Sequence, residues 1–358
     1  MSRFHTLKVK QITRETAAAV SVGFDVPADL KAEYHYKAGQ YLTLRFIMDG
    51  EEIRRSYSIC SSPYEADKLE VAVKKVKGGK VSNFINDKLQ VGDSVDVMIP
   101  MGSFSPHIDP THKKNYVLFA GGSGITPMLS IVKAILEKEP KSTIVLLYGN
   151  NDEKSIIFKD EIESLALNHH EKFRAIQILA TPPATYPLLH TGMMTVEKDL
   201  ALIENYVGLN LDNEFFICGP GPMMNNAMAV LKQLKIDDTR IHIEYFSTPT
   251  TSTAPEKTLS VAIVKNANVT IIMDGDEYPT RLLENETILE AAKRIGLDAP
   301  YSCQNGSCST CRAKLVEGKV HMKVNFALTP KDVAAHFILT CQSLPLTESV
   351  TVSYDEAV

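Results

Sequence analysis

Four cysteines in the last sixth of the chain have the spacing of an iron–sulfur site. Cys303, Cys308 and Cys311 are separated by four and then two residues, and Cys341 follows in a separate segment. This arrangement ligates a [2Fe–2S] cluster through four thiolates, whereas a structural zinc site usually shows two close pairs of ligands. The pattern therefore predicts that these four cysteines hold a cluster and that this region carries one electron at a time.

The segment around the first three cysteines suits a loop that wraps closely around a cluster. Gly306 lies among small polar residues, which let backbone N–H groups approach the sulfur atoms. From about residue 259 onward the chain resembles plant-type ferredoxins, which implies an α+β, β-grasp-like domain with a small mixed sheet and a crossing helix. Residues 286–295 are predicted as that helix, because their apolar positions share one face and Gly296 follows.

The middle region, about residues 111–246, alternates apolar strands with helical patterns. This alternation predicts a parallel, doubly wound α/β sheet, in which ligands bind at the carboxyl ends of the strands. The expected strands are 116–120, 143–148, 173–179, 213–218 and 241–245.

Two turns at strand ends resemble those of the ferredoxin–NADP reductase superfamily. One is Gly122-x-Gly124-x-Thr126-Pro127, in which Pro127 stands where the common dinucleotide fingerprint has a third glycine. The other is Cys218-Gly219-Pro220, which in that superfamily lies beside the nicotinamide ring. A glycine turn that leads into a helix can hold a pyrophosphate on its free N–H groups. The resemblance implies that both turns bind NAD(P)H.

The first region, about residues 1–110, has short apolar or alternating segments divided by turn residues, which predicts a small antiparallel barrel. The expected strands are 6–12, 18–26, 41–46, 70–76 and 94–99.

The barrel region also contains the superfamily's flavin motif, Arg55-x-Tyr57-Ser58. The resemblance implies that Arg55 binds the flavin phosphate, Tyr57 stacks on the ring and Ser58 lies near flavin N5. Gly79 and Ser82 resemble its second phosphate contact. These roles suit the side chains, since a guanidinium pairs with phosphate and an aromatic ring stacks.

The order of the regions is a flavin barrel (1–110), a nucleotide domain (111–246), a Ser-, Thr- and Pro-rich linker (247–258) and a ferredoxin-type domain (259–358). This order is similar to that of the reductase components of bacterial oxygenases, and most of all to the reductase subunits of phenylacetyl-CoA epoxidases. The resemblance implies electron flow from NAD(P)H to FAD, to the cluster and to an oxygenase. By the same analogy Cys218 and Glu244 orient the nicotinamide, and Phe246 covers the flavin.

Other acceptors stay open from the sequence, namely an aromatic-ring hydroxylase, a hybrid-cluster protein or a diffusible ferredoxin. An interpretation from another class is a metal-binding interaction module on an inactive flavoprotein scaffold. FAD is favoured over FMN by the overall resemblance.

The coenzyme prediction rests on the loop after the second nucleotide-domain strand. Asp152 and Glu153 would repel a 2′-phosphate, and Asn151 stands where related reductases often have arginine. The loop therefore favours NADH, with Lys154 or Arg174 as the basic residues that could instead serve NADPH.

Composition limits the partners. The 358 residues carry 38 basic and 43 acidic side chains, without the clustered basic patch that nucleic-acid binding requires. No apolar stretch is long enough to span a membrane, and residues 1–10 lack the apolar core of a signal peptide. The sequence predicts a cytoplasmic protein whose two other cysteines, Cys60 and Cys218, are unpaired.

Overall fold

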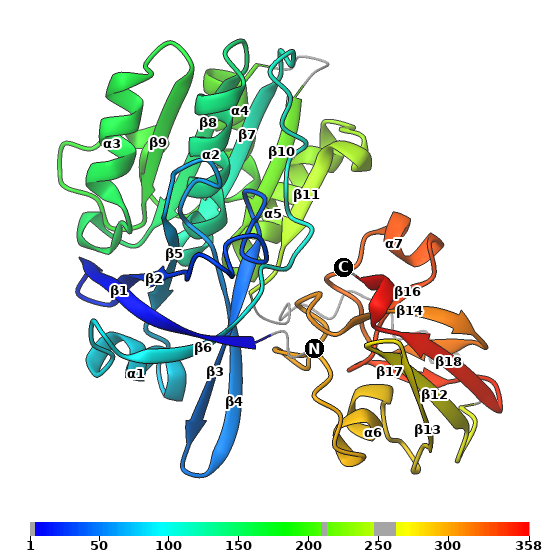
Figure 1. Ribbon diagram of the computed structural model, residues 1–358. Coiled ribbons are helices and arrows are strands. Elements are labelled where there is room, and N and C mark those ends of the chain that lie inside the picture. The colour runs from blue at the N-terminus through cyan, green and yellow to red at the C-terminus, as the bar shows by residue number, and fades with distance from the viewer. Residues whose placement is uncertain (1–3, 209–212, 247–262, 358) are drawn as a thin grey trace. The chain divides into compact units, whose positions relative to one another are not determined.

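The computed structural model describes residues 4–208, 213–246 and 263–357 (Figure 1). These residues form two compact units. The larger unit contains residues 6–53 and 57–246, and the smaller one contains residues 4–5 and 54–56 together with the C-terminal residues 263–357. The linker predicted at 247–258 lies outside the described residues.

The larger unit begins with a six-stranded antiparallel barrel in the order β4-β3-β6-β1-β2-β5. A bridge between Ile59, which follows β4, and Val71 of β5 joins the two ends of the sheet. The barrel is filled by apolar side chains such as Val22, Leu44 and Val71. Its elements are β1 (Phe4–Thr16), β2 (Ala19–Asp25), β3 (Tyr41–Met48), β4 (Glu51–Ser58), β5 (Leu69–Lys74), α1 (Lys80–Asp87) and β6 (Ser94–Met98).

All five strands predicted for the barrel are present. The sixth, β4, was not among them, because its sequence Glu-Glu-Ile-Arg-Arg-Ser-Tyr-Ser has no apolar run. This strand carries the flavin motif, so the structure gives that motif a defined backbone position.

The second part of the larger unit is a five-stranded parallel sheet in the order β11-β10-β7-β8-β9. Every predicted strand of this sheet is confirmed. The strands are β7 (Asn115–Gly121), β8 (Thr143–Asn150), β9 (Phe173–Leu179), β10 (Asn213–Cys218) and β11 (Ile241–Glu244). The helices are α2 (Ile125–Lys138), α3 (Lys159–Asn168), α4 (Val196–Tyr206) and α5 (Gly221–Gln233), with 3-10 turns η1 (Gly122–Gly124), η2 (Glu153–Ser155), η3 (Leu188–His190) and η4 (Asp238–Arg240).

Apolar clusters cover both faces of this sheet. One cluster joins α2 and α3 to residues such as Leu118 and Leu146, and the other joins α4 and α5 to residues such as Val117 and Phe215. The strand order reverses between β7 and β10 (Figure 1). A ligand crevice is expected at the carboxyl ends of the strands at such a reversal.

The C-terminal unit has a mixed sheet in the order β13-β12-β18-β14-β16, in which β12 and β18 are parallel and the other pairs are antiparallel. Its strands are β12 (Asn268–Met273), β13 (Asp276–Arg281), β14 (Arg312–Glu317), β16 (Phe337–Leu339) and β18 (Ser349–Ser353). A small second sheet pairs β15 (Val320–Met322) with β17 (Ser343–Pro345), and the helical segments are α6 (Ile288–Arg294), α7 (Pro330–Ala334) and η5 (Asp355–Ala357).

The predicted crossing helix is α6. Thr287 and Glu290 form a capping box at its N-terminus, and Ile288, Leu289 and Ala292 are buried against the sheet. The helix is shorter than the predicted 286–295, because the two first residues lie before the first helical residue and Ile295 follows the last one.

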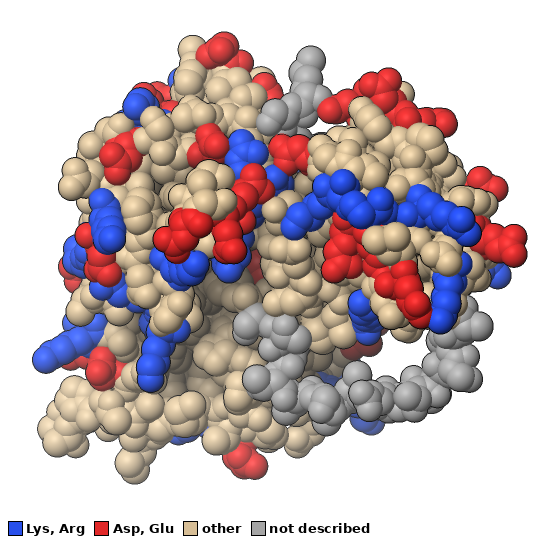
Figure 2. All heavy atoms as spheres, turned by 90° about the horizontal axis from the view of Figure 1, so that it is seen from below, with Lys and Arg blue, Asp and Glu red and all other residues tan. Residues whose placement is uncertain are grey.

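The surface carries both signs of charge. Figure 2 shows Lys and Arg side chains interspersed with Asp and Glu on one face. No helix among residues 4–208, 213–246 and 263–357 is both long and apolar enough to cross a membrane.

Candidate functional site

The flavin motif lies on β4, with its three side chains in different environments. Arg55 is exposed, Tyr57 is half-buried and Ser58 is buried. The guanidinium of Arg55 donates to the carbonyl of Arg54 at 2.7 Å and has no carboxylate partner among the described residues. An exposed guanidinium without an acidic partner keeps its donors available for a phosphate.

The predicted second phosphate contact is the N-terminus of α1. Gly79 is the N-cap residue and supplies no side-chain cap, so the first N–H groups of the helix are not capped by its own side chain. Ser82 is buried, and its hydroxyl accepts from the N–H of Val76 at 3.1 Å. The segment thus forms a rigid turn with helix N–H groups of the kind that bind phosphate.

The two nucleotide turns lie next to each other at the reversal of the parallel sheet. A Cβ on Gly124 would come within 2.0 Å of the carbonyl oxygen of Cys218, so only glycine permits this close approach. Thr126 is buried and donates to the carbonyl of Ser123 at 3.0 Å. Pro127 lies in the first turn of α2, where it fits a helix start.

Cys218, Gly219 and Pro220 join the end of β10 to the start of α5. The thiol of Cys218 is buried, and burial raises its pKa, so the sulfur is held as a neutral thiol. Cys218 pairs in register with Ala120 of β7 and Glu244 of β11. The strand ends therefore bring these predicted residues to one edge of the sheet.

Ser58 and Glu244 meet directly, although they are far apart in sequence. The hydroxyl of Ser58 donates to Oε2 of Glu244 at 3.1 Å. Removal from water raises the pKa of the Glu244 carboxyl to about 8, and the hydrogen bond from Ser58 partly offsets this rise. The end of the flavin strand and the edge of the nucleotide sheet thus share one polar contact. Phe246, two residues beyond Glu244, is 46% exposed.

Lys74 belongs to this region but was not predicted from the sequence. It ends β5, and its Nζ lies 3.3 Å from the Cβ position of Gly122 in the nucleotide turn. Within the described part of the chain it has no ion-pair partner, so it adds a free positive charge beside the turn. The sequence does not distinguish Lys74 from its neighbours, because it is one of several lysines in the segment 74–80.

The four cysteines of the C-terminal unit lie as two pairs. Sγ of Cys308 is 3.1 Å from Sγ of Cys303, and the thiols of Cys311 and Cys341 are also hydrogen-bonded. Within the described residues no three His, Cys, Asp or Glu side chains gather to hold a single ion. Two pairs of thiols fit a cluster with two irons, each of which takes two cysteine ligands.

Backbone and side-chain N–H groups point at the predicted ligands. Sγ of Cys303 accepts from the N–H groups of Asn305 at 3.4 Å and Cys308 at 3.3 Å, and Sγ of Cys341 accepts from Gln342. The hydrogen bond from Cys308, with smaller contributions from backbone N–H groups, lowers the pKa of Cys303 to about 6. The pKa of Cys341 is also lowered, first by its hydrogen bond with Cys311, whereas the hydrogen bonds with their partners raise the pKa values of Cys308 and Cys311. One cysteine of each pair is thus held toward the thiolate, the form that binds iron.

Comparison with known proteins agrees with this three-part arrangement. The chain matches an oxidoreductase FAD-binding domain at residues 6–105, an oxidoreductase NAD-binding domain at 118–229 and a 2Fe-2S iron-sulfur cluster binding domain at 271–346. It is 38% identical to a component of the 1,2-phenylacetyl-CoA epoxidase of Escherichia coli (strain K12), over 99% of both chains.

The chain belongs to the family of oxygenase reductase components that contain FAD, NAD and [2Fe–2S] domains. It is 32% identical to the ferredoxin reductase component of 3-ketosteroid-9-alpha-monooxygenase of Rhodococcus rhodochrous, over 99% of this chain and 97% of that protein. The solved structure of phthalate dioxygenase reductase shares the fold, with a TM-score of 0.59 and 21% identity over 98% of both chains. The chain is thus an NAD(P)H-dependent oxidoreductase that passes electrons to an oxygenase component.

The coenzyme loop of the reductase is a capped turn. Asp152 is the N-cap of η2, and its Oδ1 accepts from the N–H of Ser155 at 2.9 Å. Glu153 pairs with Lys159, whereas Asn151 and Lys154 are exposed. One oxygen of Asp152 and one of Glu153 are therefore already engaged, whereas the exposed side chains of Asn151 and Lys154 have no ion-pair partner among the described residues.

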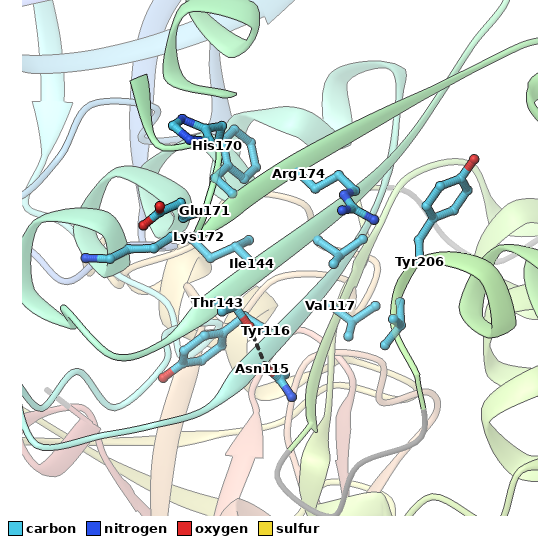
Figure 3. Close-up of a pocket in the computed structure, with 13 residues that line it drawn as sticks. Asn115, Tyr116, Val117, Thr143, Ile144, His170, Glu171, Lys172, Arg174 and Tyr206 are labelled. Carbon is cyan, nitrogen blue, oxygen red and sulfur yellow. Dashed lines mark hydrogen bonds between the residues drawn. The ribbon is translucent and has the colours of Figure 1, made fainter. Parts of the chain in front are cut away.

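Arg174, which the sequence offers as an alternative partner for a 2′-phosphate, does not lie near the coenzyme loop. In the register of β8 and β9, Arg174 lies opposite Val145, five residues before Asn150 at the carboxyl end. It lines a hollow of about 180 Å³ at the amino ends of β7, β8 and β9, where it points toward Tyr206 (Figure 3). This hollow lies at the opposite edge of the sheet from the nucleotide turns.

Proposed function

We propose that this reductase supplies electrons to an oxygenase that epoxidises phenylacetyl-CoA. The observation that supports the proposal is the 38% identity to the E. coli epoxidase component over nearly the whole length of both chains. We also propose the domain limits 1–110, 111–246 and 259–358, and a cytoplasmic location, where NADH and coenzyme A thioesters are available.

The bound flavin would accept a hydride from the nicotinamide and release electrons singly to the cluster. The residues of the chain have to place these groups. We assign Arg55 and the N-terminus of α1, with Gly79 and Ser82, to the flavin phosphates, and Tyr57 to the flavin ring. Their support is that the guanidinium of Arg55 has no carboxylate partner among the described residues and that the side chain of the N-cap residue does not cap α1.

The nucleotide turns would hold the coenzyme. Gly122, Gly124, Thr126 and Pro127 form the turn into α2, and Lys74 supplies a positive charge beside it. Cys218, Gly219 and Pro220 form the second turn, at the strand end beside Glu244.

Ser58, Cys218, Glu244 and Phe246 would act at the reacting centre. The contact between Ser58 and Glu244 supports this assignment, since it fixes the flavin strand against the edge of the nucleotide sheet. Ser58 would lie near flavin N5, to which its hydroxyl could donate when it is released from Glu244, and Cys218 and Glu244 would orient the nicotinamide. Phe246 would cover the flavin until the nucleotide displaces it.

Reconstitution tests the acceptor. The reductase, NADH and the catalytic components of the E. coli phenylacetyl-CoA epoxidase should together convert phenylacetyl-CoA to its epoxide, with NADH oxidation coupled to product. A Cys308→Ser variant should support no epoxidation but still reduce ferricyanide from the flavin. If the parent reduces its own cluster rapidly yet no epoxide forms, phenylacetyl-CoA epoxidase is the wrong acceptor. A ketosteroid monooxygenase would be tested next.

A further inference from the structure

The C-terminal unit is divided into an acidic and a basic part. Residues 264–300 carry four Lys or Arg against seven Asp or Glu, whereas residues 301–347 carry five against two. The basic part contains all four predicted cluster ligands. The cluster therefore lies in the positively charged part of a unit that is acidic as a whole.

Two of the basic side chains, both on β14, lie over one aromatic ring of the neighbouring strand β16. The guanidinium of Arg312 lies 3.6 Å from the ring centroid of Phe337, and Nζ of Lys314 lies 4.9 Å from it. Lys314 and Phe337 are cross-strand partners. Lys331 is exposed on α7, which packs against β16 (Figure 1). We define Arg312, Lys314, Lys331 and Phe337 as the cationic face.

The cationic face adjoins the cysteine loop. Arg312 directly follows Cys311, and β16 ends two residues before Cys341. The segment before α7 bonds to the loop itself, since the N–H of Phe326 donates to the carbonyl of Gly306 at 3.1 Å. A protein that docks on this face would therefore come close to the cluster.

The lysines of this face are unpaired among the described residues, whereas two of the four basic residues of the acidic part form ion pairs. Lys265 pairs with Glu284, and Arg294 pairs with Glu286. Lys314 and Lys331 have no carboxylate partner in the described ranges. Asp332, the acidic residue nearest to the face, is engaged by Arg312 and by the cap of α7.

We propose that the cationic face is the docking surface for the oxygenase component, and that it binds an acidic patch around the electron entry site of that protein. Arg312 is already paired with Asp332, so the two unpaired lysines, Lys314 and Lys331, supply the free charge of the face. Unpaired charges of one sign beside an aromatic ring suit a transient partner of the opposite charge, because they speed encounter and fix orientation. We name an oxygenase as the partner because the chain belongs to a family of oxygenase reductase components. Of the three electron acceptors in the test, only the epoxidase components depend on the proposed function.

Charge reversal tests the face. Lys314→Glu and Lys331→Glu, singly and together, are compared with Lys265→Glu, a reversal in the acidic part of the same unit. The acceptors are the catalytic components of the E. coli epoxidase, acidic cytochrome b5 and ferricyanide. We expect the double variant to raise KM for both protein acceptors about tenfold or more, with kcat changed less than about twofold. Its kcat/KM should also lose most of its dependence on salt.

Two measurements distinguish weaker docking from a loss of the cluster or the flavin. The rate at which NADH bleaches the cluster within the reductase, and the rate of ferricyanide reduction, should be unchanged in every variant. The proposal is overturned if Lys265→Glu raises KM as much as the double variant, or if the parent's transfer to cytochrome b5 is independent of salt. If the epoxidase accepts no electrons from the parent, the proposed function fails, while cytochrome b5 still decides the docking surface.

Discussion

At the scale of single residues, Arg55 shows how an unused donor indicates a ligand. Its side chain is exposed, without a carboxylate partner among the described residues, on a strand that also presents Tyr57 and Ser58. We expect Arg55→Ala to weaken flavin binding, because a charge-assisted contact to phosphate contributes about 1.5–3 kcal/mol. Equilibrium dialysis or fluorescence titration of the apoprotein should show a loss of affinity of roughly ten- to hundredfold.

The matched control for Arg55 is Arg45→Ala in β3 of the same barrel. Arg45 already pairs with Asp96 at 3.1 Å, so its removal should leave flavin affinity within about twofold. Equal retention of flavin by Arg55→Ala and the parent would show that this motif does not bind the phosphate.

Asp199 is a buried carboxyl that the electron path does not use. It is fully buried in α4, and neither carboxylate oxygen has a hydrogen-bond partner among the described residues. Burial raises its pKa from 3.8 to about 7, partly offset by Lys198. The folded protein therefore holds a proton that the unfolded chain releases, so stability is lost as pH rises from about 4 to about 7.

The substitution Asp199→Asn should remove the loss of stability that accompanies ionisation of this carboxyl. A rise in pKa from 3.8 to about 7 corresponds to roughly 4 kcal/mol at most. We expect the Tm of the variant at pH 8 to exceed that of the parent by about 5 °C or more, with little difference at pH 4. The exposed Glu204→Gln in the same helix serves as control, and a parent whose Tm does not fall between pH 4 and pH 8 would contradict the assignment.

At the scale of elements, the cysteine loop contains a glycine in the left-handed region of the backbone, which disfavours other residues. Gly306 has φ +79°, and a Cβ there would lie 2.9 Å from Cγ2 of Val324. Gly306→Ala should therefore loosen the loop and speed loss of the cluster, followed by the decay of visible absorbance in the presence of a chelator. Gly296→Ala is the control, because Gly296 has φ +82° but nothing within 4 Å of its Cβ position. Equal rates of cluster loss in the two variants would show that the contact with Val324 does not contribute to holding the cluster.

The sequence predicted some elements better than others for physical reasons. The strands of the parallel sheet are buried on both faces, so Tyr116, Val117, Leu118 and Phe119 form a continuous apolar run that is easily recognised. β4 has no such run, and its place in the barrel depends on pairing with β3. Motif resemblance, rather than periodicity, singled out its residues.

Two contacts between distant segments of the larger unit were not predicted from the sequence. The bond between Ser58 and Glu244 and the approach of Lys74 to Gly122 depend on how the barrel and the parallel sheet pack within one unit. Likewise, the sequence suggested Arg174 as a phosphate partner, but only the register of β8 and β9 shows that it lies at the wrong end of the strand.

At the scale of the whole molecule, the choice of coenzyme decides whether NADH or NADPH supplies electrons to the oxygenase. Asn151 is exposed directly after the carboxyl end of β8, and the acidic Asp152 and Glu153 follow it. We expect the parent to have a higher kcat/KM for NADH than for NADPH, because this loop offers a 2′-phosphate no arginine and places carboxylates nearby.

Asn151→Arg should shift the preference toward NADPH. A well-placed charged contact contributes about 1.5–3 kcal/mol, so the ratio of kcat/KM values should change about tenfold or more. Asp152 is left intact, since its carboxylate caps η2 and its removal would disturb the turn that positions residue 151. Arg174→Ala is the control and should leave the ratio unchanged, because Arg174 lies at the amino end of the sheet.

A parent that already favours NADPH tenfold would contradict this interpretation and leave the exposed Lys154 as the phosphate partner to test. The electron path would be unaffected, since none of its contacts involves this loop.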